Sequence, residues 1–329
     1  NAQFDTLWKH LAIAEDYVAS GGLRRFPEGW TPSTRPHMTS FLFAWAFMMP
    51  SELLFDRVEL CAHLEFTVFA WTTIVGIPAV VRRLVSRADA RWIWAARFLF
   101  PGIFLYDSNL SLGADHFGAL YGPPIFLALS HAWKRLDLRS CALLGALTGA
   151  AAIVKYTSML LLVVIPACTL LGRALWLLIA QIRGANRNLI DGRAFRGPLT
   201  ALVFGVIATS PHWLKNMIFH GDPMYPMLHD FFASRPWTAG AQYMFEWGYK
   251  DAGMWRPART LAGVWETVCA LATFSFVPNN WQRFHGMTPV FGSLFTLSLL
   301  YLPFLKKTKR IWALVAWIHG GLFLWYWTH

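Results

Sequence analysis

Long apolar stretches separated by short basic clusters are the feature of this sequence that most constrains its fold. The stretches that are long enough to cross a bilayer, or nearly so, are about 60–81, 92–106, 116–133, 141–155, 157–172, 198–214, 289–305 and 311–327. A straight span needs about 20 apolar residues, so several of them require amphipathic ends. Only 14% of the residues are charged, against about 25% in soluble domains. The pattern predicts an all-α, polytopic transmembrane helix bundle of about eight spans with outer juxtamembrane helices.

The basic residues indicate how these spans are oriented. Sixteen of the 29 Lys and Arg residues lie in four clusters between the apolar stretches, together with only three acids. The clusters are Arg82/Arg83/Arg87/Arg91, Lys134/Arg135/Arg139, Arg173/Arg183/Arg187/Arg193/Arg196 and Lys306/Lys307/Lys309/Arg310. If all four are cytoplasmic, the spans alternate without contradiction, as the positive-inside rule requires. The net charge of +11 is then an orientation signal beside anionic lipid, and no nucleic-acid partner is expected.

This orientation predicts a multi-pass protein of the plasma (inner) membrane, with a periplasmic or extracellular outer face. The predicted single transmembrane domain consists of a first outer loop with juxtamembrane helices (1–59), a six-span bundle (60–214), an outer loop with an interfacial helix (215–288) and two further spans (289–329). Residues 260–277 are apolar enough to span. A span there would place the cluster at 306–310 outside, so an interfacial helix is favoured.

The first outer loop opens with an acid, an amine and an imidazole close together. Asp5, Lys9 and His10 lie at the start of a predicted helix over residues 5–20, which a Gly-Gly pair ends. A carboxylate such as Asp5 can act as a general base when it lies within hydrogen-bond reach of its substrate. Lys9, at the i+4 position, can instead pair with Asp5 as an ordinary helix salt bridge. The sequence leaves both interpretations open.

Ionisable residues also stand at two predicted outer ends of spans. Asp115 and His116 open an otherwise uncharged span. Asp115 is either a site residue or a first-turn acid that the helix dipole favours. Lys155 lies between two apolar runs, where it either snorkels to the surface or pairs with Asp115 or with an anionic phosphate.

The span over 198–214 leads into a third outer segment with polar residues. Lys215 and Asn216 follow the span directly, and Asp222 and Tyr225 lie in a loop that Gly-Asp-Pro and Tyr-Pro make rigid. The four cysteines are far apart, without metal-ligand spacing, and are expected to be buried inert thiols. P-loop, Rossmann, HExxH and nucleophile-elbow patterns are all absent from the sequence.

The order and topological side of these stretches resemble GT-C integral membrane glycosyltransferases, in the branch of the protein mannosyltransferases and aminoarabinose transferases. The stretches that carry the resemblance are residues 5–11, the Gly-Ala-Asp turn ending at Asp115, the Lys-Tyr-Thr helix end at Lys155, the loop 216–226 and the span start at 286–291. They cover nearly the whole chain, which is expected to be a portion of a longer protein, without the first and last spans.

The resemblance implies transfer of a sugar from a polyprenyl-phosphate carrier to an acceptor at the outer membrane face. Asp5 takes the position of the catalytic carboxylate, and Asp115 that of a second catalytic acid which orients groups or helps to hold a metal. The expected substrate-binding residues are His10, His116, Lys155, Lys215, Asn216, Asp222 and Tyr225. The departing polyprenyl phosphate needs positive charge from Lys, Arg, His or a divalent cation, so the cofactor stays open.

Two alternatives remain. Lys9 stands where related sequences usually carry an aromatic residue, and Asp222 stands where Asn is usual. These departures favour a non-catalytic structural subunit with partner subunits in a larger membrane complex. A transporter is the weaker alternative, because transporters need a midplane site built from broken helices, whereas the polar residues here collect at one face.

Overall fold

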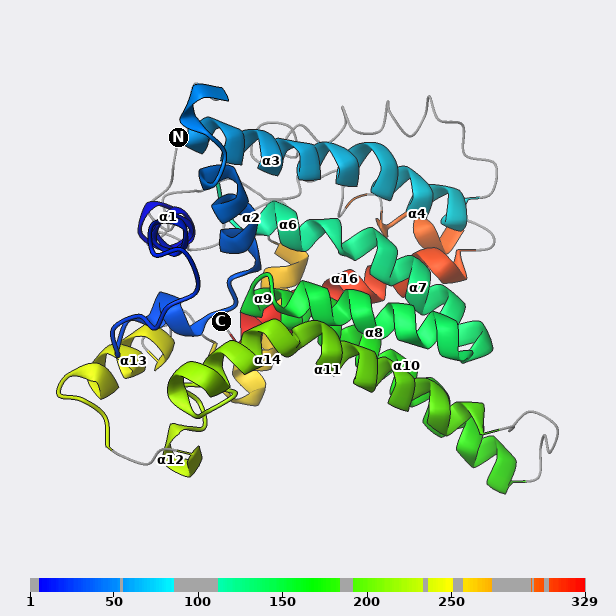
Figure 1. Ribbon diagram of the computed structural model, residues 1–329. Helices are drawn as coiled ribbons and strands as arrows, with labels where there is room; N and C mark the ends of the chain where they lie inside the picture. Colours follow the sequence, from blue (N-terminus) through cyan, green and yellow to red (C-terminus); the bar gives the residue numbers. More distant parts are fainter. Residues whose placement is uncertain are drawn as a thin grey trace.

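The computed structural model describes residues 6–53, 56–85, 112–183, 192–232, 236–250, 257–273, 297, 299–304 and 308–328. Within these residues all regular secondary structure is helical, so the predicted all-α class is confirmed. Figure 1 shows a bundle of long helices, with shorter helices arranged across one end of it. Asp5 lies outside the described residues, as do the predicted span 92–106 and most of 289–305.

The bundle contains, among the described residues, six helical stretches that correspond to predicted spans. In chain order they are α3–η4–α4 (Arg57–Trp71, Thr72–Gly76, Ile77–Leu84), α6–α7 (Asp115–Leu120, Gly122–Arg135), α8 (Leu138–Ala152), α9–η6–α10 (Tyr156–Ser158, Met159–Val164, Ile165–Ile182), α11 (Arg193–His220) and α16 (Lys309–Thr328). Two of them, 57–84 and 156–182, are long and apolar enough to cross a membrane by length and composition.

Two prolines explain why the two longest apolar stretches change helix type midway. In an α-helix a proline ring clashes with the carbonyl four residues earlier. For Pro78 and Pro166 these carbonyls belong to Ile74 and Leu162, which lie in the π-helical turns η4 and η6. The wider turn accommodates each ring, so both stretches continue as helix through the proline.

Small residues bring α8 and α11 into close contact. A Cβ atom added to Gly145 would lie 2.8 Å from the Cα of Ala201, and one added to Gly149 would lie 2.6 Å from the carbonyl oxygen of Gly205. Both helices therefore use small residues four positions apart, the pattern with which membrane helices bring their backbones together. This pair is the most extensive helix–helix contact in the described chain.

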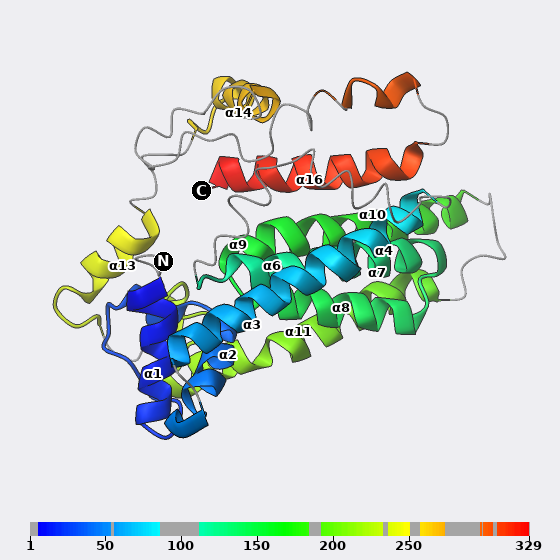
Figure 2. The ribbon, with the colours of Figure 1, turned by 90° about the horizontal axis from the view of Figure 1, so that it is seen from above.

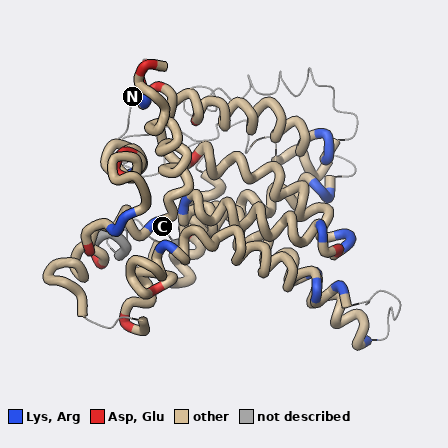
Figure 3. The backbone as a smooth tube through the Cα atoms, viewed as in Figure 1, with Lys and Arg blue, Asp and Glu red and all other residues tan. Residues whose placement is uncertain are grey.

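Lys and Arg positions predominate at one end of the bundle, on the right in Figure 3, whereas the other end mixes them with Asp and Glu. The described residues of the predicted clusters lie where α4, α7 and α10 end and where α8, α11 and α16 begin, except Arg173, which lies within α10. The Nη1 atom of Arg310 donates to the carbonyl oxygen of Arg83 at 3.1 Å, and Arg173 stacks over Trp133 at 5.5 Å. Clusters that are far apart in sequence are therefore neighbours in space.

The opposite end carries the shorter helices. After η1 (Thr6–Leu11), α1 (Ala12–Ala19) stops just before Gly21, whose φ of 69° suits glycine; the predicted end of this helix is confirmed. The chain continues through η2 (Thr31–Thr34), α2 (Met38–Phe47) and η3 (Ser51–Leu53). Figure 1 places α1 and α2 beside the bundle end, with α12 (His229–Phe232) and α13 (Ala241–Lys250) nearby.

The two predicted outer segments meet at this end. The backbone N–H of Thr238 donates to Glu28 Oε2 at 3.1 Å. Gly29 has a φ of 91°, and its lack of a side chain lets the first loop pass close to α13, because a Cβ there would lie 3.1 Å from the Cα of Ala241. In the second outer segment, α14 (Leu261–Thr273) covers most of the predicted interfacial helix. Figure 2 shows α14 near α16. The short η9 (Leu302–Phe304) lies between these two helices in sequence.

Candidate functional site

Asp115 forms the centre of a charged cluster at the end of the bundle opposite the basic clusters. Lys155 Nζ lies 2.8 Å from Asp115 Oδ1, so of the alternatives that the sequence leaves open for Lys155 the structure shows the pair with Asp115. The pair is open, because the Asp115 side chain is 76% exposed and that of Lys155 is 35% exposed. A carboxylate and an ammonium group are therefore presented together where a ligand can reach them.

A buried glutamate holds the helix that carries Asp115. Glu65, on α3, is 1% exposed and accepts two hydrogen bonds of 2.7 Å, from the backbone N–H of Leu112 and from Nδ1 of His116. Leu112 has a φ of 58°, a left-handed conformation that is costly for leucine. Glu65 thus anchors both sides of Asp115 to the neighbouring helix.

Opposing effects set the ionisation of Asp115. The protein atoms packed around Asp115 raise its pKa although the side chain itself faces solvent, but the charge and hydrogen bond of Lys155, with smaller contributions from His116 and Lys9, bring the pKa below its ordinary value. Asp115 is therefore a carboxylate at neutral pH. Lys9 in η1, whose charge is among those that act on Asp115, is itself 5% exposed.

A second group of polar residues lies at the C-terminal end of α11, around Lys215. This lysine is 7% exposed, and its Nζ donates to the carbonyl oxygen of Ser33 at 2.7 Å. Burial lowers its pKa to about 8. Among the described residues no carboxylate forms an ion pair with it. A cavity of about 100 Å³ adjoins the lysine, lined by His37, Met38, Phe41, Ile153, Pro211, His212 and Lys215.

The hydrogen bonds of His37 fix its neutral form. Its Nε2 lies 3.0 Å from the carbonyl oxygen of Pro32, which can only accept, so Nε2 carries the proton. Nδ1 then accepts from the Tyr17 hydroxyl at 2.8 Å. Burial, and secondarily the charge of Lys215, lower the pKa of His37 well below its usual value. His10 also contributes to this lowering, so it belongs to the Lys215 group.

His212 joins the cavity to the surrounding helices. Its Nε2 lies 3.4 Å from the Tyr156 hydroxyl and 3.5 Å from the side-chain nitrogen of Asn216. Nδ1 is buried and has no hydrogen-bond partner in the described part of the chain. The Tyr156 hydroxyl also donates to the carbonyl oxygen of Thr34 at 3.3 Å.

The predicted site residues thus divide between two neighbouring groups. Lys155 and Lys9 act on Asp115, whereas the residues that directly follow them, Tyr156 and His10, take part in the Lys215 group. Two short stretches of backbone therefore serve both groups. His116 joins the first group and Asn216 the second, where it is fully buried.

Asp222 and Tyr225 lie in the loop after α11. Asp222 is 1% exposed and accepts from the backbone N–H of Met224 at 2.7 Å, which holds the turn; burial raises its pKa. Tyr225 stacks on His220 with 3.8 Å between ring centroids and packs against Trp237 and Phe245. The contacts of both residues are those of a packed loop.

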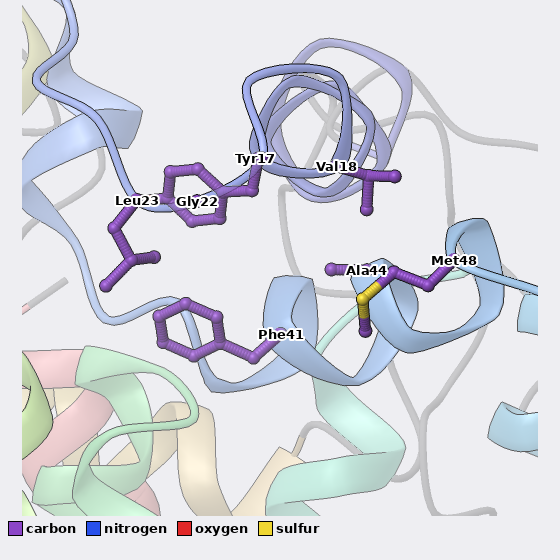
Figure 4. A pocket seen from close by; sticks show the side chains of 8 residues that line it. Tyr17, Val18, Gly22, Leu23, Phe41, Ala44 and Met48 are labelled. Atoms are coloured by element: carbon purple, nitrogen blue, oxygen red, sulfur yellow. The ribbon is translucent and has the colours of Figure 1, made fainter.

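An apolar pocket of about 400 Å³ lies between α1 and α2. Figure 4 shows Tyr17, Val18, Leu23, Phe41, Ala44 and Met48 around it. Phe41 lines both this pocket and the smaller cavity beside Lys215. No three His, Cys, Asp or Glu side chains within the described ranges are arranged to hold a metal ion.

Sequence reasoning did not select His37 or His212 as site residues. His37 follows a proline at the start of an apolar helix, and His212 follows Pro211 within one. An imidazole directly after a proline in or beside an apolar helix was the available signal. Glu65, on the other hand, was noticeable as an acid inside a predicted span.

Fold and site together define an all-helical bundle that carries two polar groups at the end away from its basic clusters. Over residues 38–329 the sequence matches the family described as "Domain of unknown function (DUF8201)", and the chain belongs to this family. No curated protein and no solved structure matches the chain.

Proposed function

We propose that this chain is a multi-pass membrane protein that transfers a sugar from a polyprenyl-phosphate carrier to an acceptor at the outer membrane face. The proposal has a topological part, in which about eight spans cross the bilayer with the basic clusters in the cytoplasm. It has a chemical part, in which the Asp115 group serves the reaction. The similarity of the sequence to GT-C glycosyltransferases motivates both parts.

The surface of the bundle supports the topological part. In the two longest apolar stretches only 17% and 22% of the most apolar window is buried inside the protein, whereas the core helix of a soluble protein is mostly buried. Large apolar side chains such as Leu202, Ile207 and Trp176 are more than half exposed. A surface of this kind needs lipid or another apolar partner. The gathering of Lys and Arg at one bundle end agrees with the positive-inside rule.

The Asp115–Lys155 pair is the observation that carries the chemical part. Sugar transfer from a phosphate carrier requires a carboxylate near the acceptor and positive charge near the leaving phosphate. An open carboxylate and an open ammonium group 2.8 Å apart supply both at the outer end of the bundle. Glu65 and His116 hold this pair in place.

In the proposed reaction the acceptor hydroxyl gives its proton to a carboxylate, and its oxygen forms a bond to the anomeric carbon. The bond between that carbon and the phosphate oxygen breaks, and polyprenyl phosphate leaves. Asp5 is proposed as the base and Asp115 as the acid that orients the reactants. Lys155, with Lys9 and His116 close to Asp115, stabilises the charge on the leaving phosphate. A divalent cation is an open addition to this charge.

The test is transfer of radiolabelled sugar from a panel of short-chain polyprenyl-phosphate sugars by the protein in native membranes. Asp5→Asn and Asp115→Asn should each reduce transfer at least a hundredfold. Asp16→Asn is the matched control, because Asp16 is an acid of the same outer end that pairs with Arg24 on the surface. Wild-type turnover in both Asp5→Asn and Asp115→Asn would refute the assignment.

A non-catalytic subunit of a membrane complex is the second candidate. The ion pair with Lys155 that lowers the pKa of Asp115 weakens this carboxylate as a base and suits a structural role. A folded protein that co-purifies with stable partners, and transfers no sugar from any carrier in the panel, would favour this candidate.

A further inference from the structure

The cavity beside Lys215 combines features that point to an anionic ligand. An isolated buried ammonium group is costly, because burial removes its hydration without supplying a counter-charge. Lys215 is 7% exposed, and in the described chain its one hydrogen bond goes to a neutral carbonyl oxygen. An ammonium group has three N–H donors, so two remain for a ligand.

The other groups around the cavity are suited to an oxyanion rather than a cation. His212 has a buried Nδ1 atom without a partner in the described chain, which donates to a ligand when it carries the ring proton, and His37 is held neutral by Pro32 and Tyr17. The cavity is also lined by the first turn of α2, through Met38 and Phe41. The N-terminal end of a helix carries partial positive charge and favours anions. None of the cavity-lining side chains is acidic.

The size of the cavity limits the ligand. A volume of about 100 Å³ holds a few water molecules, whereas sites for drug-sized ligands enclose about 300–1,000 Å³. A complete sugar or nucleotide therefore exceeds it, but a single tetrahedral oxyanion does not. The Asp115 group is a separate site, because Asp115, Lys155 and His116 do not line this cavity.

We propose that the cavity formed by Lys215, His212 and the first turn of α2 binds a phosphate-type oxyanion, at a site separate from the Asp115 carboxylate. The Lys215 ammonium group supplies the counter-charge, and His212 Nδ1, when it carries the ring proton, a further hydrogen bond. This inference does not rest on the sugar-transfer reaction, since oxyanion binding is measured without a sugar donor.

The experiment is calorimetric titration of the full chain, purified in a neutral detergent, with inorganic phosphate at pH 7. Lys215→Met should weaken phosphate binding at least tenfold. Replacing a buried charge with an apolar group of similar size is often neutral or stabilising, so this variant is expected to fold, and a thermal melt checks it. Lys134→Met, at an exposed lysine in the last turn of α7 and outside both polar groups, should leave this binding within twofold of wild type.

A second arm identifies the source of the oxyanion by replacing inorganic phosphate with a short-chain polyprenyl phosphate. Lys215-dependent binding of inorganic phosphate supports a free oxyanion, and Lys215-dependent binding of the lipid phosphate alone supports a lipid head group. The proposal would be overturned by no binding of either ligand to the wild-type chain, by equal binding to wild type and Lys215→Met, or by an equal loss of binding in Lys134→Met. His212→Gln gives an independent check, with an expected loss of threefold to tenfold.

Discussion

The contact between α8 and α11 allows a quantitative test of the bundle, with Gly145→Ala as the perturbation. The new Cβ would lie 2.0 Å from the carbonyl oxygen of Ala201, whereas even close carbon–oxygen contacts between helices are about 3.3–3.6 Å long. The helices must therefore move apart by roughly 1.3 Å or more at this point. Overpacking of this kind typically costs about 1–3 kcal/mol, while the exchange of glycine for alanine in a helix gains about 1 kcal/mol.

Gly172→Ala is the matched control for this perturbation. Gly172 lies within α10, and a Cβ added there meets no atom within 4 Å. The gain in helix propensity is common to both variants, so the difference between their free energies of unfolding isolates the steric cost, about 1–3 kcal/mol. Reversible unfolding in mixed detergent measures this difference. If the two variants are equally stable, the close contact between α8 and α11 is wrong.

Three further perturbations test other parts of the described structure. Glu65→Gln should reduce the free energy of unfolding by about 1–3 kcal/mol, because it weakens the buried carboxylate that accepts hydrogen bonds from Leu112 and His116. Glu59→Gln, on the exposed face of α3, should be neutral. Equal melting temperatures of the two variants would contradict the anchoring role of Glu65. Arg24→Ala should reduce the free energy of unfolding by less than about 1 kcal/mol, because its ion pair with Asp16 lies at the surface. Chemical denaturation measures this difference, and a larger loss would show that the pair is more than a surface contact. The folded-state pKa of His37 lies well below its unfolded value of about 6.5. The neutral imidazole therefore contributes fully to the free energy of unfolding above about pH 6.5, and this contribution falls by up to about 1.4 kcal/mol for each pH unit below it. His37→Gln should flatten this part of the stability–pH curve, and an unchanged curve would refute a buried neutral imidazole.

The sequence predicts those features that depend on local pattern and on topology. The end of the first helix at Gly21 follows from the conformational freedom of glycine, and the structure confirms it. Placing Asp115 and Lys155 at the same ends of neighbouring apolar helices makes their pairing one of the alternatives, and the structure shows that pair. In both cases a short stretch of sequence contains the physical cause.

Features that depend on backbone irregularity or on packing are not readable in the same way. The first turn of the outer loop, Thr6–Leu11, is a π-helix, so α-helical i+4 spacing does not decide which of its side chains share a face. The charge of Lys9 acts on Asp115, over a hundred positions away in the chain. Glu65 illustrates the same limit, because an acid in a span indicates a site but not which of its neighbours it binds.

The division of the polar residues into two groups has a consequence for how they act together. Lys9 and His10 are adjacent in the chain, as are Lys155 and Tyr156, and each pair contributes one residue to each group. Backbone that moves to accommodate a ligand in one group therefore moves a residue of the other. A ligand couples two sites only when it binds their two arrangements with different affinity, and these shared stretches provide a physical route for such coupling between the Lys215 cavity and Asp115.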